Sequence, residues 1–430
     1  MKTLRTMVPK LVTALALLSL IGCSGMPAVV AAKVVQSDVE REIAPDVDPG
    51  DLEAVAAGNR AFALALYQAL KDGGPDNLFY SPHSISVALA MTYAGARGTT
   101  EAQMAEALHF TLDQERLHPA FNALDQLLES RGEGAEGKDD EGFRLNVVNA
   151  LWGQKGFGFQ EAFLDVLARN YGAGLRLVDF EKAAEAARQT INAWVSEQTE
   201  ERIQDLIPPG ALDAATRLVL TNAIYFNAGW LYPFESSRTI DEPFTRLDGS
   251  QVTVPMMAQQ EGLGYWAGEG YQAVDLLYSG GELSMTILLP DEGNFQAFED
   301  ALDAEQVEAV LAALRRQEIA LTMPKFELES SFSLPEALKQ LGMEDAFTGA
   351  ADFSGMTGGR DLYISDVLHK AFISVDEKGT EAAAATAVIM KLTAMPAEPI
   401  RVSVDRPFVF LIRDIETGTI LFMGRMLDPS

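Results

Sequence analysis

The side chains that could perform hydrolytic chemistry in this chain are Ser81, Ser84 and His369, which could supply a nucleophile and a base. A hydrolase also needs an acid that orients the histidine, and a setting that activates the serine. The sequence contains no such paired acid, and no serine lies in a Gly-x-Ser-x-Gly turn. We therefore predict that the protein is not an enzyme.

Metal and cofactor chemistry finds equally little support. The four histidines and the single cysteine are scattered, without the spacing of a metal site, and there is no glycine-rich phosphate loop. The formal net charge is −29, which argues against binding to nucleic acids or other polyanions because these need basic patches. We predict no metal, no cofactor and no nucleic-acid partner.

The lone cysteine has a different chemistry available to it. Three basic residues precede an apolar run at residues 11–21, which is too short to cross a bilayer, and the run ends in Leu-Ile-Gly-Cys at Cys23. This pattern is similar to the lipobox of bacterial lipoproteins, in which the cysteine is lipidated. An uncleaved anchor and a simple secretory signal are the alternatives. We predict a signal peptide at 1–22, a lipidated Cys23 within a flexible tether at 23–50, and a location on the cell envelope or outside the cell. Because Ser24 is not the aspartate that favours inner-membrane retention, the outer membrane is expected if the source is Gram-negative.

The rest of the chain, residues 51–430, reads as one large α+β domain. Hydrophobic residues make up 48% of the sequence, enough for a large core, and neither a repeat nor a second boundary is evident. Thr100 and Gln103 have the spacing of a capping box. Helices dominate the first part and strands the second. The patterns predict helices at 59–70, 84–96, 100–108, 160–171, 182–199 and 334–341, and strands at 145–152, 218–226, 283–289 and 319–326.

Residues 377–390 form an unusual segment, because they connect elements and yet have the composition of a buried strand. An exposed loop is normally polar and rich in turn-forming residues. Here the side chains are small or β-compatible, and the one glycine, Gly379, could act as a hinge. In a strand, alternate residues would share a face that carries no charge and no proline, while Glu381 would point to the other side. The face begins with Thr380, Ala382, Ala384 and Thr386.

This segment resembles the proximal hinge of the reactive loop of serpins, the serine protease inhibitor superfamily. The resemblance continues from about Asn59 to Pro429, through several distinct motifs in the family's order. These are the segments at 77–86 and 95–104, the strand at 221–226 with Trp230, and the closing strands at 406–411 and 421–425.

The resemblance implies the serpin fold: a single domain with about nine helices, three β-sheets and an exposed reactive-centre loop at about 377–400. It further implies two sites in the main sheet. The family's polar "shutter" beneath the sheet would comprise Ser81, Ser84, Asn222 and His369, although these residues would also suit an ordinary satisfied polar core. The "breach", where the loop first enters, would comprise Trp230, Lys325 and Glu377, with an ion pair between the last two.

The activity implied is suicide inhibition of a serine protease, or alternatively of a cysteine protease, by a monomer. The cleaved loop would insert into the main sheet while the protease is still bound as an acyl-enzyme. Counting from the hinge places the reactive bond at Thr393-Ala394, which suits an elastase- or subtilisin-like target. Other registers remain open: Lys391-Leu392 would suit a trypsin-like protease, and Leu392-Thr393 or Met395-Pro396 a chymotrypsin-like one. A non-inhibitory serpin, acting as a binding or chaperone-like module, is the alternative function.

Overall fold

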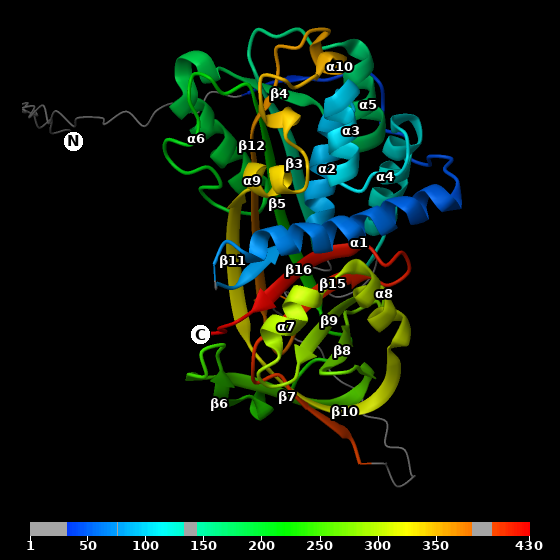
Figure 1. Ribbon diagram of the computed structural model, residues 1–430, viewed down its shortest axis with the longest axis vertical. Coiled ribbons are helices and arrows are strands. Elements are labelled where there is room, and N and C mark those ends of the chain that lie inside the picture. Colours follow the sequence, from blue (N-terminus) through cyan, green and yellow to red (C-terminus); the bar gives the residue numbers. More distant parts are fainter. Residues whose placement is uncertain (1–31, 75, 133–143, 381–397) are drawn as a thin grey trace, which may run out of the picture.

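The computed structural model describes residues 32–74, 76–132, 144–380 and 398–430. Most helices of this part gather at one end of the molecule, but two short ones, at Phe295–Ala301 and Ala304–Ala313, lie towards the other end (Figure 1). This part contains ten α-helices and two 3-10 helices, at Ser236–Arg238 and Asp345–Phe347. The α-helices are α1 Pro49–Lys71, α2 Pro82–Tyr93, α3 Gly98–Ala107, α4 Gln114–Glu129, α5 Glu161–Tyr171, α6 Phe180–Gln198, α7 Phe295–Ala301, α8 Ala304–Ala313, α9 Pro335–Gln340 and α10 Ser354–Thr357.

The first of two sheets has seven strands in the order β1-β4-β3-β5-β13-β12-β11. Its central strand, β5, is buried along its whole length, as its nearly continuous apolar run predicts. Helix α6 packs on one face of this sheet over a smaller core, and α2 packs on the other face against the main core. The strands are β1 Lys33–Val35, β3 Arg144–Gln154, β4 Leu175–Val178, β5 Leu218–Gly229, β11 Phe326–Ser333, β12 Ile364–Val375 and β13 Gly379–Thr380.

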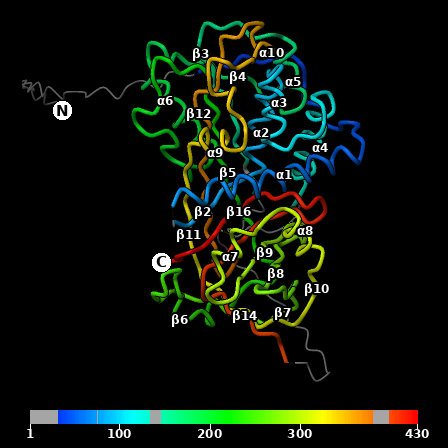
Figure 2. Tube along the Cα trace, viewed as in Figure 1, coloured from blue at the N-terminus to red at the C-terminus, as the bar shows by residue number. Residues whose placement is uncertain are grey.

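The second sheet has nine strands and forms the other end of the molecule (Figure 2). Eight strands follow the order β14-β10-β7-β8-β9-β15-β16-β2, and β6 pairs with β7. Strand β7 is 17 residues long. It pairs with β6 and β10 along its first part and with β8 at its end, so it connects these strands into one continuous sheet. The strands are β2 Leu78–Tyr80, β6 Ile240–Thr245, β7 Gln251–Ala267, β8 Tyr271–Leu277, β9 Leu283–Pro290, β10 Arg315–Pro324, β14 Ile400–Ser403, β15 Phe408–Asp414 and β16 Ile420–Met426.

The α+β, single-domain architecture expected from the sequence is confirmed, but two local expectations differ from the structure. The supposed capping box at Thr100 and Gln103 lies inside α3, which begins at Gly98. Both side chains instead accept hydrogen bonds from backbone N–H groups of Asp352 and Asp345, at 2.9 and 2.8 Å. They therefore hold a neighbouring loop rather than the helix end.

The second difference concerns the predicted flexible tether at 23–50. Its described part packs against the domain, because β1 pairs with β4 and extends the seven-stranded sheet. Further along, the Arg41 guanidinium contacts the carboxylates of Asp125 and Glu129 on α4. Composition alone did not predict these contacts, because a three-residue edge strand has too little periodicity to be recognised.

Candidate functional site

The first two hinge residues, Gly379 and Thr380, are already part of the seven-stranded sheet, at the end where β12 finishes. Strand β13, only two residues long, lies between β5 and β12: Thr380 pairs with Val375 on one side and with Ala228 on the other. From Phe372 towards its start, β12 pairs directly with β5. Strand β13 is therefore a two-residue wedge that separates β5 from β12 at one end, and the gap between them closes beyond it.

Gly379 is required by the geometry of this wedge. Its φ of +153° is a conformation that residues with a side chain rarely adopt. A Cβ atom at this position would lie 2.2 Å from the carbonyl oxygen of Ala228 and 2.7 Å from the Cα of Gly229. The hinge backbone thus crosses β5 at a distance that only glycine allows.

Thr380, the first member of the face expected to be buried, is completely buried. Its hydroxyl lies 2.9 Å from that of Tyr278, whose ring stacks on Trp230 with centroids 4.6 Å apart. Burial raises the pKa of Tyr278 above its ordinary value, so the phenol stays protonated and can donate to Thr380. The sequence did not indicate a role for Tyr278, because no local motif marks it and its partners lie far away in the chain.

The three breach residues meet at the turn between β12 and β13. Lys325 Nζ lies 2.7 Å from Glu377 Oε2, which is the ion pair expected from the sequence. The indole of Trp230 donates to the carbonyl of Asp376 at 2.9 Å. The hydroxyl of Thr239 donates to the other carboxylate oxygen of Glu377 at 2.7 Å, a contact that the sequence did not indicate. One carboxylate therefore links the β10–β11 junction to the segment that follows β5.

Hydrogen bonding governs the charge of this carboxylate. Burial alone would raise the pKa of Glu377, but the hydrogen bonds from Lys325 and Thr239 outweigh it and place the pKa below the ordinary value. The group is therefore ionised at neutral pH, as both contacts require.

The four shutter residues also lie together, beneath the middle of the sheet. His369 Nδ1 faces the side-chain oxygen of Asn222, and His369 Nε2 accepts from the backbone N–H of Ser81 at 3.2 Å. These partners require a neutral ring with its proton on Nδ1. Burial lowers the pKa of His369 to about 3, which keeps the ring neutral. The amide of Asn222 donates to the hydroxyl of Ser84, so the network crosses the junction between β5 and β12.

Asn149 on β3 completes this network and was not identified from the sequence. It pairs with Asn222 in the antiparallel ladder, and Asn222 pairs with His369 in the parallel one, so the three residues form a row across β3, β5 and β12. The Asn149 oxygen accepts from the amide of Asn222. The available signal was an asparagine within a strand, where this residue type is depleted.

The same geometry argues against a hydrolytic triad. The hydroxyl of Ser81 donates to the carbonyl of Leu421 at 2.6 Å, and His369 Nδ1 faces an amide rather than a carboxylate. Ser81, Ser84 and His369 are all fully buried, so no substrate reaches them in this state. The arrangement can hold two strands together, but it does not present a nucleophile.

Other predicted sites lie outside the described residues. These are the hinge positions Ala382, Ala384 and Thr386, the candidate reactive bond Thr393-Ala394, and the lipidation site Cys23. Within the part that is described, no group of three or more His, Cys, Asp or Glu side chains is placed to hold a metal ion. The helices in this part include none with the length and apolarity needed to span a membrane.

Comparisons of the sequence and of the fold with known proteins all identify the same family. A sequence model of the family described as "Serpin (serine protease inhibitor)" matches residues 57–429. A serpin-like protein of Thermococcus kodakarensis is 43% identical over 384 residues, covering 89% of this chain and 87% of that protein. The human leukocyte elastase inhibitor is 39% identical over 389 residues, covering 88% and 100%. The crystal structure of tengpin, a thermophilic serpin in the native state, matches with a TM-score of 0.80 at 29% identity, covering 93% and 100%.

Proposed function

The chain belongs to the serpin family, and from that premise we propose that it inhibits serine-type endopeptidases as a suicide substrate. The observation that carries this proposal is the two-residue wedge. Strand β13 has begun to occupy the position between β5 and β12 that a longer inserted strand would fill. The sequence that follows it has no charge or proline on the inward face.

The register of the wedge supports further insertion. If β13 continued in the same antiparallel register, each added residue would pair with β12 and β5 at once. Six residues beyond Thr380, the strand would bring Thr386 between His369 and Asn222. A threonine hydroxyl can both donate and accept, so it could replace the direct contact that the two side chains lose. The loop sequence and the buried polar cluster are thus complementary.

In the proposed reaction, the protease nucleophile attacks the carbonyl carbon of Thr393. The bond to Ala394 breaks, the new amine takes its proton from the protease's general acid, and an acyl-enzyme remains. Insertion of about 14 residues at about 3.3 Å each would carry the bound protease about 45 Å along the sheet. Distortion of its oxyanion hole would then stall hydrolysis of the acyl bond, since one lost donor costs about 10²–10³-fold in rate.

The target class is proposed as elastase-like or subtilisin-like. A small-to-medium Thr393 suits the pocket of such proteases, and a relative named leukocyte elastase inhibitor is 39% identical to this chain. A shift of one or two residues would change the class, because the residue before the cut determines which pocket accepts the loop.

The test is a mixture of the purified protein with elastase-, subtilisin-, chymotrypsin- and trypsin-like proteases, followed by a denaturing gel. We expect a complex that resists denaturant, together with a released peptide that begins at Ala394. Clean cleavage without complex by every protease that cuts the loop would contradict inhibition and favour the non-inhibitory alternative. A peptide with another N-terminus would relocate the reactive bond.

We also propose that the protein is anchored to the bacterial cell envelope through lipid on Cys23. The lipobox-like sequence and the absence of a second cysteine support this location. Strand β4, with which β1 pairs, and strand β14, which follows the loop, lie at opposite ends of the molecule (Figure 2). An anchor attached near β1 would therefore leave the loop directed away from the membrane.

A further inference from the structure

A small cavity of about 180 Å³ lies where the N-terminal strand β1 adds to the sheet beside helix α6. Both α6 and β4, the neighbour of β1, belong to the helical end of the molecule (Figure 1). Ala32, the residue before β1, packs against the smaller core that α6 covers. Most side chains around the cavity are small or aliphatic: Ala32, Val178, Ala183, Ala186, Ala187 and Thr190. The space is therefore apolar, and it is smaller than the sites that take drug-sized molecules, so it suits a short hydrocarbon chain.

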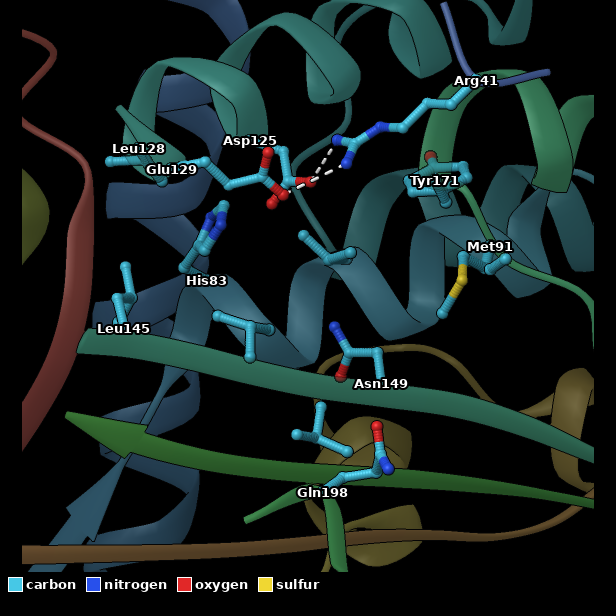
Figure 3. Close-up of a pocket in the computed structure, with 14 residues that line it drawn as sticks. Arg41, His83, Met91, Asp125, Leu128, Glu129, Leu145, Asn149, Tyr171 and Gln198 are labelled. Atoms are coloured by element: carbon cyan, nitrogen blue, oxygen red, sulfur yellow. Dashed lines mark hydrogen bonds and ion pairs between the residues drawn. The ribbon is translucent and has the colours of Figure 1, made fainter. Parts of the chain in front are cut away.

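The wall that β1 contributes is held in place without a ligand. Residues Lys33–Val35 pair with β4 in an antiparallel ladder. Further along the N-terminal segment, the Arg41 guanidinium contacts Asp125 and lies 3.1 Å from Glu129, both on α4 (Figure 3). A cavity whose wall is already ordered costs less conformational entropy to fill than one that forms on binding.

A cation without an acidic partner lies on the same face of the sheet. Arg176 on β4 is two residues from Val178, so strand alternation directs both side chains to the face covered by α6, about 7 Å apart. The Arg176 guanidinium lies 4.2 Å from the ring centroid of Trp194 and 5.6 Å from that of Trp152. Among the described residues, only these ring contacts engage the guanidinium.

Helix α6 connects the cavity with this guanidinium. Thr190 lines the cavity, and Trp194 follows it by about one helical turn and contacts Arg176. Val34, which pairs with Arg176 on β1, is 43% exposed, so solvent reaches the sheet at this point. The apolar space and the cation are therefore neighbours along one side of α6.

The charge balance at this place is unusual for the chain. The formal net charge is −29, yet neither Lys33 nor Lys155, which line the cavity, forms an ion pair with a described residue. Asp179, the one acid of the wall, accepts a hydrogen bond from the backbone N–H of Lys182 at 3.1 Å and caps α6. Burial lowers the pKa of Arg176, as expected of a guanidinium without a carboxylate beside it, but arginine stays charged at neutral pH.

We propose that this site binds an alkyl carboxylate, with its chain in the cavity beside Ala32 and Val178 and its carboxylate on the Arg176 guanidinium. A carboxylate matches the planar fork of donors that arginine presents and can accept two hydrogen bonds from it. An unbranched chain can cover the distance of about 7 Å between the cavity wall and the cation. The site goes beyond the proposed inhibitory function and does not depend on it.

The binding test uses octanoate as the probe and 1-octanol, which has the same chain without the charge, as its matched control. The protein is the full chain with Cys23→Ser, so that no lipid of its own can compete. Tryptophan fluorescence follows the octanoate titration, because Trp194 contacts the guanidinium, and competition with octanoate gives the affinity for octanol. We expect saturable binding of octanoate, roughly tenfold tighter than that of octanol. In Arg176→Gln this ratio should fall to about one, the effect of losing a charge-assisted hydrogen bond.

Arg169→Gln is the control variant, because it removes the same charge from an exposed position on α5 outside the cavity, and it should leave the ratio unchanged. If Arg176→Gln does not fold, Ala186→Phe provides the second test. Its ring, placed on the cavity wall from a half-buried position, should weaken both probes alike, by roughly tenfold or more.

Several results would overturn the site: no saturable fluorescence change, equal affinities for the two probes, an unchanged ratio in Arg176→Gln, or undiminished binding in Ala186→Phe. A fall of the ratio in Arg169→Gln equal to that in Arg176→Gln would also overturn it, because net charge and not the guanidinium would then control binding. None of these measurements involves a protease, so their failure would leave the proposed inhibition standing, and a failure of inhibition would leave this site standing.

Discussion

Glu377 is a single residue whose two carboxylate oxygens contact different parts of the sheet margin, Lys325 on one side and Thr239 on the other. We expect Glu377→Gln to remove the ion pair and to increase the rate of spontaneous loop insertion about fivefold at pH 7. The Lys325 side chain is 35% exposed, so the pair is worth no more than about 1 kcal/mol. Incubation followed by native electrophoresis in urea measures the rate.

The surface pair between Lys339 and Glu336 is the matched control, because its atoms are also 2.7 Å apart but lie on α9. Lys339→Ala should leave the insertion rate unchanged. Equal acceleration by both substitutions would mean that general destabilisation, and not the contact at the breach, controls insertion. The Glu377 contribution should be present above the ordinary carboxyl pKa and lost as pH falls through its lower folded value.

His369 should make the native state sensitive to acid. Its pKa is about 3 when folded and about 6.5 when unfolded, so below pH 6.5 the unfolded chain binds more protons. The free energy of unfolding is therefore undiminished by His369 above pH 6.5. Below this pH, His369 lowers it by up to about 1.4 kcal/mol per pH unit, until the pH reaches about 3. Protonation would also place a donor at Nε2 opposite the N–H of Ser81.

In His369→Gln, which keeps a donor and an acceptor without titrating, the slope of unfolding free energy between pH 6.5 and 5 should decrease by about one proton. Urea unfolding at several pH values measures it. His109→Asn should change the slope much less, since its ring is only partly buried. If His369→Gln and His109→Asn showed the same pH dependence of the unfolding free energy, the acid sensitivity could not be assigned to His369.

Among the secondary-structure elements, β13 is the one that would determine, in the proposed mechanism, whether the sheet accepts the loop. Thr380→Arg would place a charge at a fully buried position beside Tyr278, which is costly without a partner. We expect the variant to be cleaved as a substrate, with at least a tenfold loss of trapped protease per molecule. Glu381→Arg is the matched control, because alternation directs that side chain to the opposite face. Densitometry of denaturing gels measures the amount of trapped protease per inhibitor molecule. Unchanged trapping by Thr380→Arg would refute the role of the wedge.

For the whole molecule, loop cleavage should change stability more than any point substitution. A full inserted strand adds hydrogen bonds to both β5 and β12, and turns the two-residue wedge into a continuous ladder. We expect the cleaved protein to unfold roughly 20 °C or more above the intact one, which corresponds to several kcal/mol at about 2–4 °C each. Differential scanning calorimetry before and after limited proteolysis tests this. An unchanged unfolding temperature would favour the passive binding module.

The location that we propose for the whole molecule depends on one residue, Cys23. Cys23→Ser should move the protein from the membrane fraction to the soluble fraction and abolish incorporation of labelled fatty acid. Because the described residues from 33 onward pack on the domain independently of Cys23, folding and protease trapping should be unaffected. Persistence of the variant in the membrane fraction would support the uncleaved-anchor alternative.

The sequence by itself was sufficient for the fold class, for most long elements and for the residue types of the hinge. These depend on local periodicity, as in the apolar run of β5, or on alternation along a strand, as at Thr380. The family resemblance also indicated which polar residues to examine, and the structure brings Ser81, Ser84, Asn222 and His369 together.

Only the tertiary structure decided what depends on contacts between distant segments. It placed Asn149 in the shutter row, added Thr239 to Glu377, packed Arg41 against α4 and paired β1 with β4. Each of these contacts joins residues at least 65 positions apart. Local patterns carry no information about such distances, because the energy of these contacts appears only once the chain has closed on itself.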